Sequence, residues 1–294
     1  MGPIVYFFFS GTAFFAAAGL LLATTLLPAR GARKALGIAS RSITILGVAV
    51  VVLSSTPLPI WLYALWGMAM LAWVIAQVGS PHLPGRTILA ARLPAALLCV
   101  VAVGVEAPWH VARPVELPAS RNVYVVGDSL SAGLEPAKRK PWPEVMGQRY
   151  DLNVFNLAIA GATAASAAEQ APRIGGGDAV VILAIGGNDL LGRTAVQDFE
   201  VDLGQLIEQV RAPGRRLIMF ELPLPPMRQR YGLVQRRLAK ANDVVLIPKR
   251  FLAKILTTPG ATVDGIHLSE VGHRMMADLV GSLLRAAEAG AKQQ

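Results

Sequence analysis

The spacing of apolar and polar residues divides the chain into two parts near residue 110. Before that point, several apolar runs approach the roughly 20 residues that a helix needs to cross a bilayer. After it, short apolar runs alternate with amphipathic stretches, which is typical of the strands and helices of a soluble α/β protein. We therefore predict a transmembrane helical region over 1–107, a proline-rich linker over 108–121 and a soluble domain over 122–290.

The first part contains two clear candidate membrane spans and two weaker ones. Pro3–Leu27 carries no charge, and Ile60–Val78 holds aromatic residues suited to interfacial or packing positions. Ile43–Ser55 is short, and Ile88–Val105 contains Arg92 near one end, from which its head can reach the lipid headgroups. We expect about four transmembrane helices.

Basic residues in short loops predict the orientation of these helices, because they favour the cytoplasmic side. The loop after the first span is basic, with Arg30, Arg33, Lys34 and Arg41. With four spans, the soluble domain lies on the outer face of a bacterial inner membrane, in the periplasm; with three, it would be cytoplasmic. A cleaved signal peptide is the alternative for the first span, but that span has no basic segment before its long apolar run.

Composition agrees with this division. Apolar residues make up 53% of the chain and charged residues 16%, and only seven of the 28 Lys and Arg residues lie within 1–118. The net charge of +9 is diffuse, and the clusters Lys138–Lys140 and Arg236–Arg237 are too short for a nucleic-acid-binding surface. The single cysteine, Cys99, lies in an apolar run, which excludes an intramolecular disulfide and a cysteine-based metal site.

In the second part, strands and helices alternate, which predicts a parallel sheet with right-handed crossovers. The predicted strands are Val123–Val126, Leu152–Asn156, Ala179–Ala184, Arg216–Glu221 and Val244–Ile247. The predicted helices are Pro143–Arg149, Thr163–Ala171, Val196–Val210, Gly232–Ala241, Lys249–Leu256 and Glu270–Ala287.

Chemically useful residues follow these strands. Ser129 comes after the first strand, Gly161 after the second and Asn188 after the third, while Asp264 and His267 precede the last helix. Ligands of parallel α/β sheets bind at the carboxyl ends of the strands, so we expect all five residues at one edge of the sheet.

Together these residues would supply the parts of an acyl-transfer site. Ser129 is the candidate nucleophile, His267 its general base, and Asp264 the group that fixes the imidazole tautomer. The oxyanion that forms on the substrate needs fixed donors. The Asn188 side chain and the backbone N–H groups of Gly161 and Ser129 are the candidates.

The four segments "GDSLSAG", "AIAGATAASA", "GGNDLL" and "DGIHLSEVGH" resemble, in this order, the SGNH (GDSL-type) hydrolase family. Ser129, Gly161, Asn188 and His267 match its four name-giving residues, and the resemblance is greatest to its arylesterase/thioesterase I/lysophospholipase L1 branch. Ala162 and Leu268 depart from the usual residues of that branch. The resemblance implies a flavodoxin-like three-layer α/β/α sandwich, an acyl-enzyme mechanism, and neither cofactor nor metal.

The leading functional hypothesis is therefore a membrane-anchored serine esterase. Its substrate would be a small acyl ester, such as an O-acetylated glycan or a lysophospholipid, and its other partner the lipid bilayer. The alternative is an acyltransferase that uses the same triad to move an acyl group onto an envelope glycan. Hydrolysis is favoured because the predicted spans carry few polar residues beyond Arg41 and Arg92 that could line a path for an acyl donor. A non-catalytic binding module would require a missing triad member, and none is missing.

Overall fold

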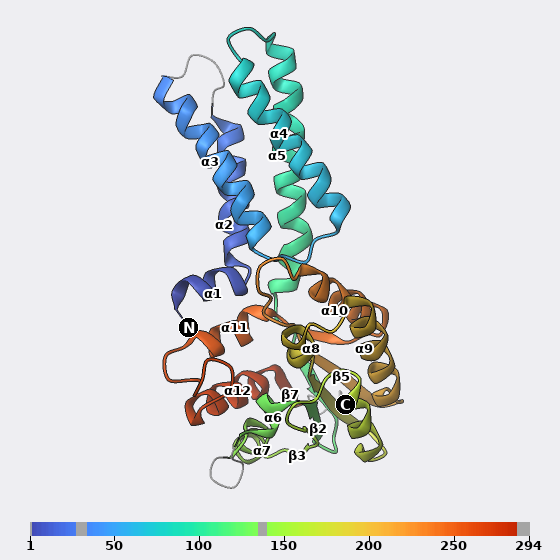
Figure 1. Ribbon diagram of the computed structural model, residues 1–294. Helices are drawn as coiled ribbons and strands as arrows, with labels where there is room; N and C mark the ends of the chain where they lie inside the picture. The colour runs from blue at the N-terminus through green and yellow to red at the C-terminus, as the bar shows by residue number, and fades with distance from the viewer. Residues whose placement is uncertain (1, 28–33, 135–139, 287–294) are drawn as a thin grey trace, which may run out of the picture. The chain divides into compact units, whose positions relative to one another are not determined.

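The computed structural model describes residues 2–27, 34–134 and 140–286, which form two compact units. The helical unit comprises Phe7–His110 together with the short segment Leu224–Gln229. The sheet unit comprises Met1–Tyr6, Val111–Pro223 and Arg230–Gln294. Figure 1 labels the elements of both.

Apolar residues form both the inside and the outside of the helical unit. Its helices are α2 (Thr12–Leu26), α3 (Lys34–Leu53), α4 (Ile60–Gly79), α5 (Gly85–Glu106) and the 3₁₀ turn η1 (Ala107–His110). Phe14, Trp66 and Trp73 belong to its buried core, whereas Leu46 and Leu71 lie outside with 64% and 60% of their surface exposed. A helix in water presents polar residues on its outer face, so this pattern matches an apolar surrounding.

By length and composition, two helices of the described residues could cross a membrane: Ile60–Gly79, with a mean hydropathy of 1.5, and Gly85–His110, with 2.3. The second of these contains the predicted span Ile88–Val105. The weaker candidate Ile43–Ser55 lies at the end of α3, whose apolar part, Gly37–Leu53, is shorter than these two helices.

The first predicted span, Pro3–Leu27, is not one straight helix. It is divided into α1 (Pro3–Phe9) and α2, with a bend of 75° between them. The break lies at Ser10 and Gly11, where Gly11 takes a left-handed φ of 85° and the Ser10 hydroxyl accepts a hydrogen bond from the backbone N–H of Thr12. The sequence therefore predicted an apolar run here, but it did not predict the bend. Counting this pair as one broken span gives up to three spans.

The sheet unit is built on five parallel strands, which confirms the predicted α/β fold with a parallel sheet. They are β2 (Asn122–Gly127), β3 (Asn153–Asn156), β4 (Ala179–Ala184), β5 (Arg215–Phe220) and β6 (Val245–Ile247). Their order across the sheet is β3-β2-β4-β5-β6, the doubly wound order found in flavodoxin-like folds. Each predicted strand end lies within about one residue of the observed one, because continuous apolar runs such as Val180–Leu183 are buried on both faces.

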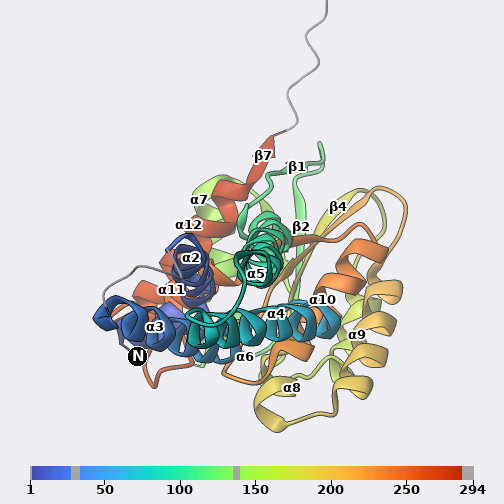
Figure 2. The same ribbon diagram turned by 90° about the horizontal axis from the view of Figure 1, so that it is seen from above.

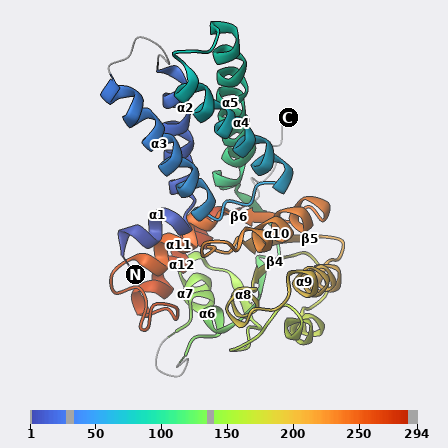
Figure 3. The same cartoon turned by 45° about the horizontal axis from the view of Figure 1, so that its top comes forward.

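Helices cover both faces of this sheet (Figures 2 and 3). One face packs against α7 (Trp142–Tyr150), α11 (Lys249–Thr257) and α12 (Glu270–Leu283). The other faces α9 (Val196–Val210) and α10 (Gln229–Ala241), and η2 (Ser166–Arg173) contacts both β2 and α9. Two short helices that we did not predict, α6 (Ser129–Ala132) and α8 (Gly187–Gly192), follow β2 and β4.

Two predictions about secondary structure were wrong. The predicted helix Thr163–Ala171 is the 3₁₀ helix η2, which contains Pro172, a residue that cannot donate the backbone hydrogen bond of a regular α-helix. The predicted last helix ends at Leu283 rather than Ala287, and Ala287 lies outside the described residues. The chain instead enters β7 (Leu284–Ala286), which pairs in parallel with β1 (Val115–Leu117).

That strand pair changes the description of the predicted linker. Its residues Val115 and Leu117 are buried and Glu116 between them is exposed, the alternation of a half-buried strand. Part of 108–121 is therefore a strand paired with the last strand of the sheet unit.

Candidate active site

Ser129 stands at the carboxyl end of β2, at the first residue of α6. Asp128 caps this short helix, because its carboxylate accepts the backbone N–H of Leu130 at 3.0 Å. A side chain at Gly127 would be crowded, since a Cβ atom there would lie 3.0 Å from both the Ala184 carbonyl oxygen and Ser131 Oγ. A tight strand-to-helix turn thus presents a partly exposed Ser129 at this edge of the sheet.

Two amides that the sequence did not single out hold this turn in place. Gln170, fully buried on η2, accepts the Gly127 N–H and donates to the Gly127 carbonyl, both at 2.9 Å. Asn156, at the end of β3, donates its side-chain amide to the Ser131 carbonyl at 2.9 Å. The only sequence signal for Gln170 was its position beside alanines, which the structure shows to be buried in η2.

Asp264 and His267 form a compact turn before α12. One carboxylate oxygen of Asp264 accepts the backbone N–H groups of Ile266 at 3.0 Å and His267 at 2.8 Å. The other oxygen lies 2.6 Å from His267 Nδ1. These hydrogen bonds, first among them that from the His267 ring, hold the pKa of Asp264 well below its usual range. The ionised carboxylate keeps a proton on Nδ1, which leaves His267 Nε2 as a base.

His267 belongs to the same neighbourhood as Ser129. It lies within electrostatic range of Asp128, the residue before Ser129: burial raises the pKa of the Asp128 carboxyl group, and His267 is one of the groups that oppose this rise. No hydrogen bond joins Ser129 Oγ to His267 in the described part of the chain. Catalytic contacts of this kind commonly tighten only when substrate binds.

The second and third segments are joined to each other. The Asn188 side-chain amide donates to the Ala162 carbonyl at 2.8 Å, which fixes its orientation and leaves its second N–H for another acceptor. Asp189 is buried and accepts the Ala164 N–H at 2.9 Å. Gly161 has a left-handed φ of 81° and is exposed, so its backbone can approach a ligand without steric hindrance from a side chain.

Ser129, Gly161 and Asn188 thus follow β2, β3 and β4, on the side of the sheet where the strand order reverses between β2 and β4, and Asp264 and His267 precede α12. Residues 125–275 match the model of the GDSL-like Lipase/Acylhydrolase family, a match that extends over about half of the chain. The chain belongs to this family. It is a serine hydrolase of the GDSL type, a class that cleaves ester bonds.

Curated relatives agree with this assignment. Esterase TesA of Pseudomonas aeruginosa is 28% identical over 162 residues, which cover 51% of this chain and 80% of the relative. Thioesterase 1/protease 1/lysophospholipase L1 of Escherichia coli is 26% identical over 177 residues, covering 57% and 85%. Among solved structures, a crystal structure of TesA aligns with 25% identity and a TM-score of 0.47, over 55% of this chain and 97% of that one.

The carboxyl edge of this GDSL hydrolase also contains a buried ion pair. Glu221 follows β5, and its carboxylate accepts Arg236 Nε of α10 at 2.7 Å and the backbone N–H of Lys249 on α11 at 3.1 Å. Arg236 is only 4% exposed. Arg236, one of the two residues of the Arg236–Arg237 cluster, is therefore buried in an ion pair inside the fold. It is not available to bind an external polyanion.

Asp128 makes the stability of this hydrolase depend on pH. Burial raises its pKa to about 6, although the Leu130 N–H and His267 oppose the shift. A carboxyl group whose pKa is higher in the folded than in the unfolded protein stabilises the fold fully below pH 4. That contribution is lost as the pH rises from about 4 to about 6, and it amounts to about 3 kcal/mol.

We expect Asp128→Asn to flatten this part of the pH profile, because a neutral amide can still accept the Leu130 N–H but does not ionise. The free energy of unfolding would be measured by urea denaturation at pH 4 to 8, with a brief protease treatment reporting how much of the protein is unfolded at each urea concentration. The control is Asp151→Asn, at an exposed carboxylate. A wild-type profile in the Asp128→Asn variant would contradict the assignment.

Proposed function

We propose that this chain is a membrane-anchored serine esterase that hydrolyses small acyl esters, such as an O-acetyl group on a glycan or the ester of a lysophospholipid. The observation that carries the proposal is the Asp264–His267 hydrogen bond of 2.6 Å, supported by the electrostatic interaction of His267 with Asp128, the residue before Ser129. The names of the relatives, an esterase and a thioesterase/lysophospholipase, support an acyl substrate.

In the proposed reaction, Ser129 Oγ attacks the ester carbonyl carbon while His267 Nε2 takes the hydroxyl proton. Asp264 stabilises the imidazolium that results. The tetrahedral intermediate collapses, His267 gives the proton to the leaving alkoxide, and an alcohol departs from the acyl-enzyme. Water, deprotonated by His267, then attacks the acyl carbon, and the carboxylic acid and free Ser129 are released.

The oxyanion needs donors that are in position before it forms. We assign this role to the second N–H of the Asn188 amide and to the backbone N–H groups of Gly161 and Ser129. The hydrogen bond from Asn188 to the Ala162 carbonyl supports the assignment, because it holds the amide in one orientation.

The fate of the acyl group tests hydrolysis against transfer. We expect purified protein given p-nitrophenyl acetate to release acetate and p-nitrophenolate in equal amounts, with or without a high concentration of a sugar acceptor. Ion chromatography for acetate and absorbance for p-nitrophenolate measure the ratio. Loss of acetate with matching acetylation of the sugar would replace the esterase with the acyltransferase alternative.

We further propose that residues 1–107 anchor the hydrolase domain, 122–290, in the bacterial inner membrane through 108–121, with the domain in the periplasm. The two long apolar helices and the exposed apolar side chains of α3 and α4 support an anchor. The orientation depends on the basic loop after the first span, whose Arg30 and Arg33 lie outside the described residues.

A fusion at the C-terminus tests this orientation. Alkaline phosphatase folds to an active form only outside the cytoplasm, where its disulfides can form. We expect cells that express the fusion to have phosphatase activity in the membrane fraction. An inactive fusion, together with activity of a matched fusion to a reporter that functions only in the cytoplasm, would reverse the topology.

A further inference from the structure

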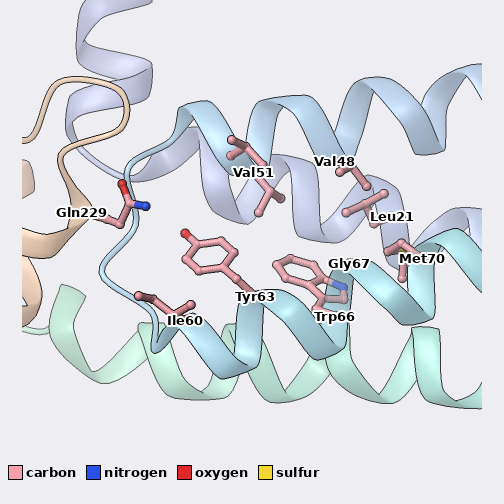
Figure 4. Close-up of a pocket in the computed structure, with 10 residues that line it drawn as sticks. Leu21, Val48, Val51, Ile60, Tyr63, Trp66, Gly67, Met70 and Gln229 are labelled. Atoms are coloured by element: carbon pink, nitrogen blue, oxygen red, sulfur yellow. The ribbon is translucent and has the colours of Figure 1, made fainter.

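An apolar cavity of about 250 Å³ lies within the helical unit, among α2, α3 and α4 (Figure 4). Its walls are mainly aliphatic and aromatic, and include Leu21, Val48, Val51, Trp66 and Met70. It is larger than the apolar cavities of about 150 Å³ that bind benzene in engineered proteins. Its chemistry therefore suits a hydrocarbon rather than water.

The cavity is elongated along α4. Its lining runs from Ile60 to Met70 on that helix, which corresponds to about 15 Å at the α-helical rise. This length is about half the roughly 30 Å hydrocarbon core of a bilayer, and so about the depth of one leaflet. Ile60 and Val52 line it and are also 59% and 45% exposed, so the cavity opens to the outside of the unit.

One end of the cavity is polar. Gln229, from the segment Leu224–Gln229, lies there near Tyr63 (Figure 4). Gln229 Oε1 is buried, and among the described residues it has no hydrogen-bond partner. The Tyr63 hydroxyl does not fill this role, because it donates to the Thr56 carbonyl at 2.8 Å. A buried acceptor without a donor is costly, so it indicates a missing group that would donate to it.

We infer that this cavity binds one acyl chain of a lipid, with a hydroxyl group at the polar end of that lipid donating to Gln229 Oε1. The site is separate from Ser129 and goes beyond the proposed esterase activity, since it requires no reaction. Gln229 follows β5 in the chain by only a short loop, and the Ser55 hydroxyl donates to the carbonyl of Pro225 in that loop. Lipid binding would therefore add a hydrogen bond at the first residue of α10, at the end of this loop.

Gly67 provides the test. It lines the cavity, and a Cβ atom built there meets no heavy atom within 4 Å. Gly67→Leu should place a side chain in the space of the acyl chain without a clash. Gly104 on α5 is equally open and exposed but lines no part of the cavity, so Gly104→Leu is the matched control for the change in helix propensity.

The probe is a monoalkylglycerol ether, which an esterase cannot cleave, with a photoreactive diazirine in its alkyl chain, at 1% in phosphatidylcholine vesicles that contain the full chain. After irradiation, mass spectrometry would locate the labelled residues. We expect labelling of Val48, Met70 and their neighbours, at least fivefold weaker in Gly67→Leu and unchanged in Gly104→Leu. Equal labelling in all three proteins, or labelling spread evenly over the outer helix faces, would overturn the inference.

Gln229→Leu tests the polar end independently of the cavity variant. With wild type, the monoalkylglycerol probe should label the cavity about three to ten times more than a methyl ether of the same alkyl chain, which has no hydroxyl group. The substitution should remove this preference. An equal response of wild type to both probes would show that no hydroxyl is recognised. Hydrolysis of p-nitrophenyl acetate, unchanged in every variant, would show that the proteins are folded.

Discussion

Replacing Ser129 by alanine should reduce the hydrolysis of p-nitrophenyl acetate by about 10⁶-fold, since loss of the nucleophile of a serine hydrolase costs about as much as loss of the whole triad. The substitution removes only the hydroxyl group. The turn around it is held by other contacts, namely the two hydrogen bonds of Gln170 to Gly127 and the cap of Asp128 on Leu130. A loss of activity would therefore report on chemistry and not on folding.

Ser131 is the matched control, two residues further along α6. Its hydroxyl accepts the indole N–H of Trp142 at 3.2 Å and lies inside the fold. Ser131→Ala should cost about 1 kcal/mol of stability and leave the rate within a few-fold of wild type. Initial rates and denaturant midpoints for both variants separate the two effects. Substantial activity in Ser129→Ala would exclude Ser129 as the nucleophile.

Replacing Asp264 by asparagine should lower kcat by about 10⁴-fold. The oxygen that accepts the Ile266 and His267 backbone N–H groups would be kept by the asparagine carbonyl, so its NH₂ group would face His267 Nδ1. The ring would then carry its proton on Nε2, the nitrogen that has to accept the proton of Ser129. The positions of the residues would be kept, but His267 Nε2 could no longer accept the proton of Ser129.

A control for this variant is Asp243→Asn. Asp243 is exposed, precedes β6 at the opposite edge of the sheet, and has a left-handed φ of 52° that asparagine tolerates. It should leave kcat unchanged. A pH–rate profile of Asp264→Asn, measured from pH 5 to 10, would identify the mechanism of the loss. A drop of only a few-fold across that range would mean that His267 does not depend on Asp264.

Local patterns predicted the sheet well because each strand carries its own signal. Ala179–Ala184 is continuously apolar and fully buried, and it is observed with the predicted bounds. Three of the four family segments follow β2, β3 and β4 and the fourth leads into α12, as the sequence predicted. Their catalytic roles stay predictions until the variants above are measured.

The sequence did not predict features that depend on contacts between distant parts of the chain. Gln170 gains its meaning only from Gly127, 43 positions earlier. The pairing of β1 with β7 joins two segments of three residues, each too short to show a periodic pattern. Pro172 and Gly11 were visible as breakers, but composition alone did not decide how each would reshape its helix.

The β1–β7 pair has a practical consequence. Adjacent strands lie about 4.8 Å apart, so β1, near the start of the segment Val111–Pro223, lies beside β7, at the end of the described residues. A domain with neighbouring ends can be inserted into another protein, or joined to a different anchor, without stretching its fold. Any variant that joins the sheet unit to a different anchor therefore has to keep Leu284–Ala286, because this strand pairs with β1.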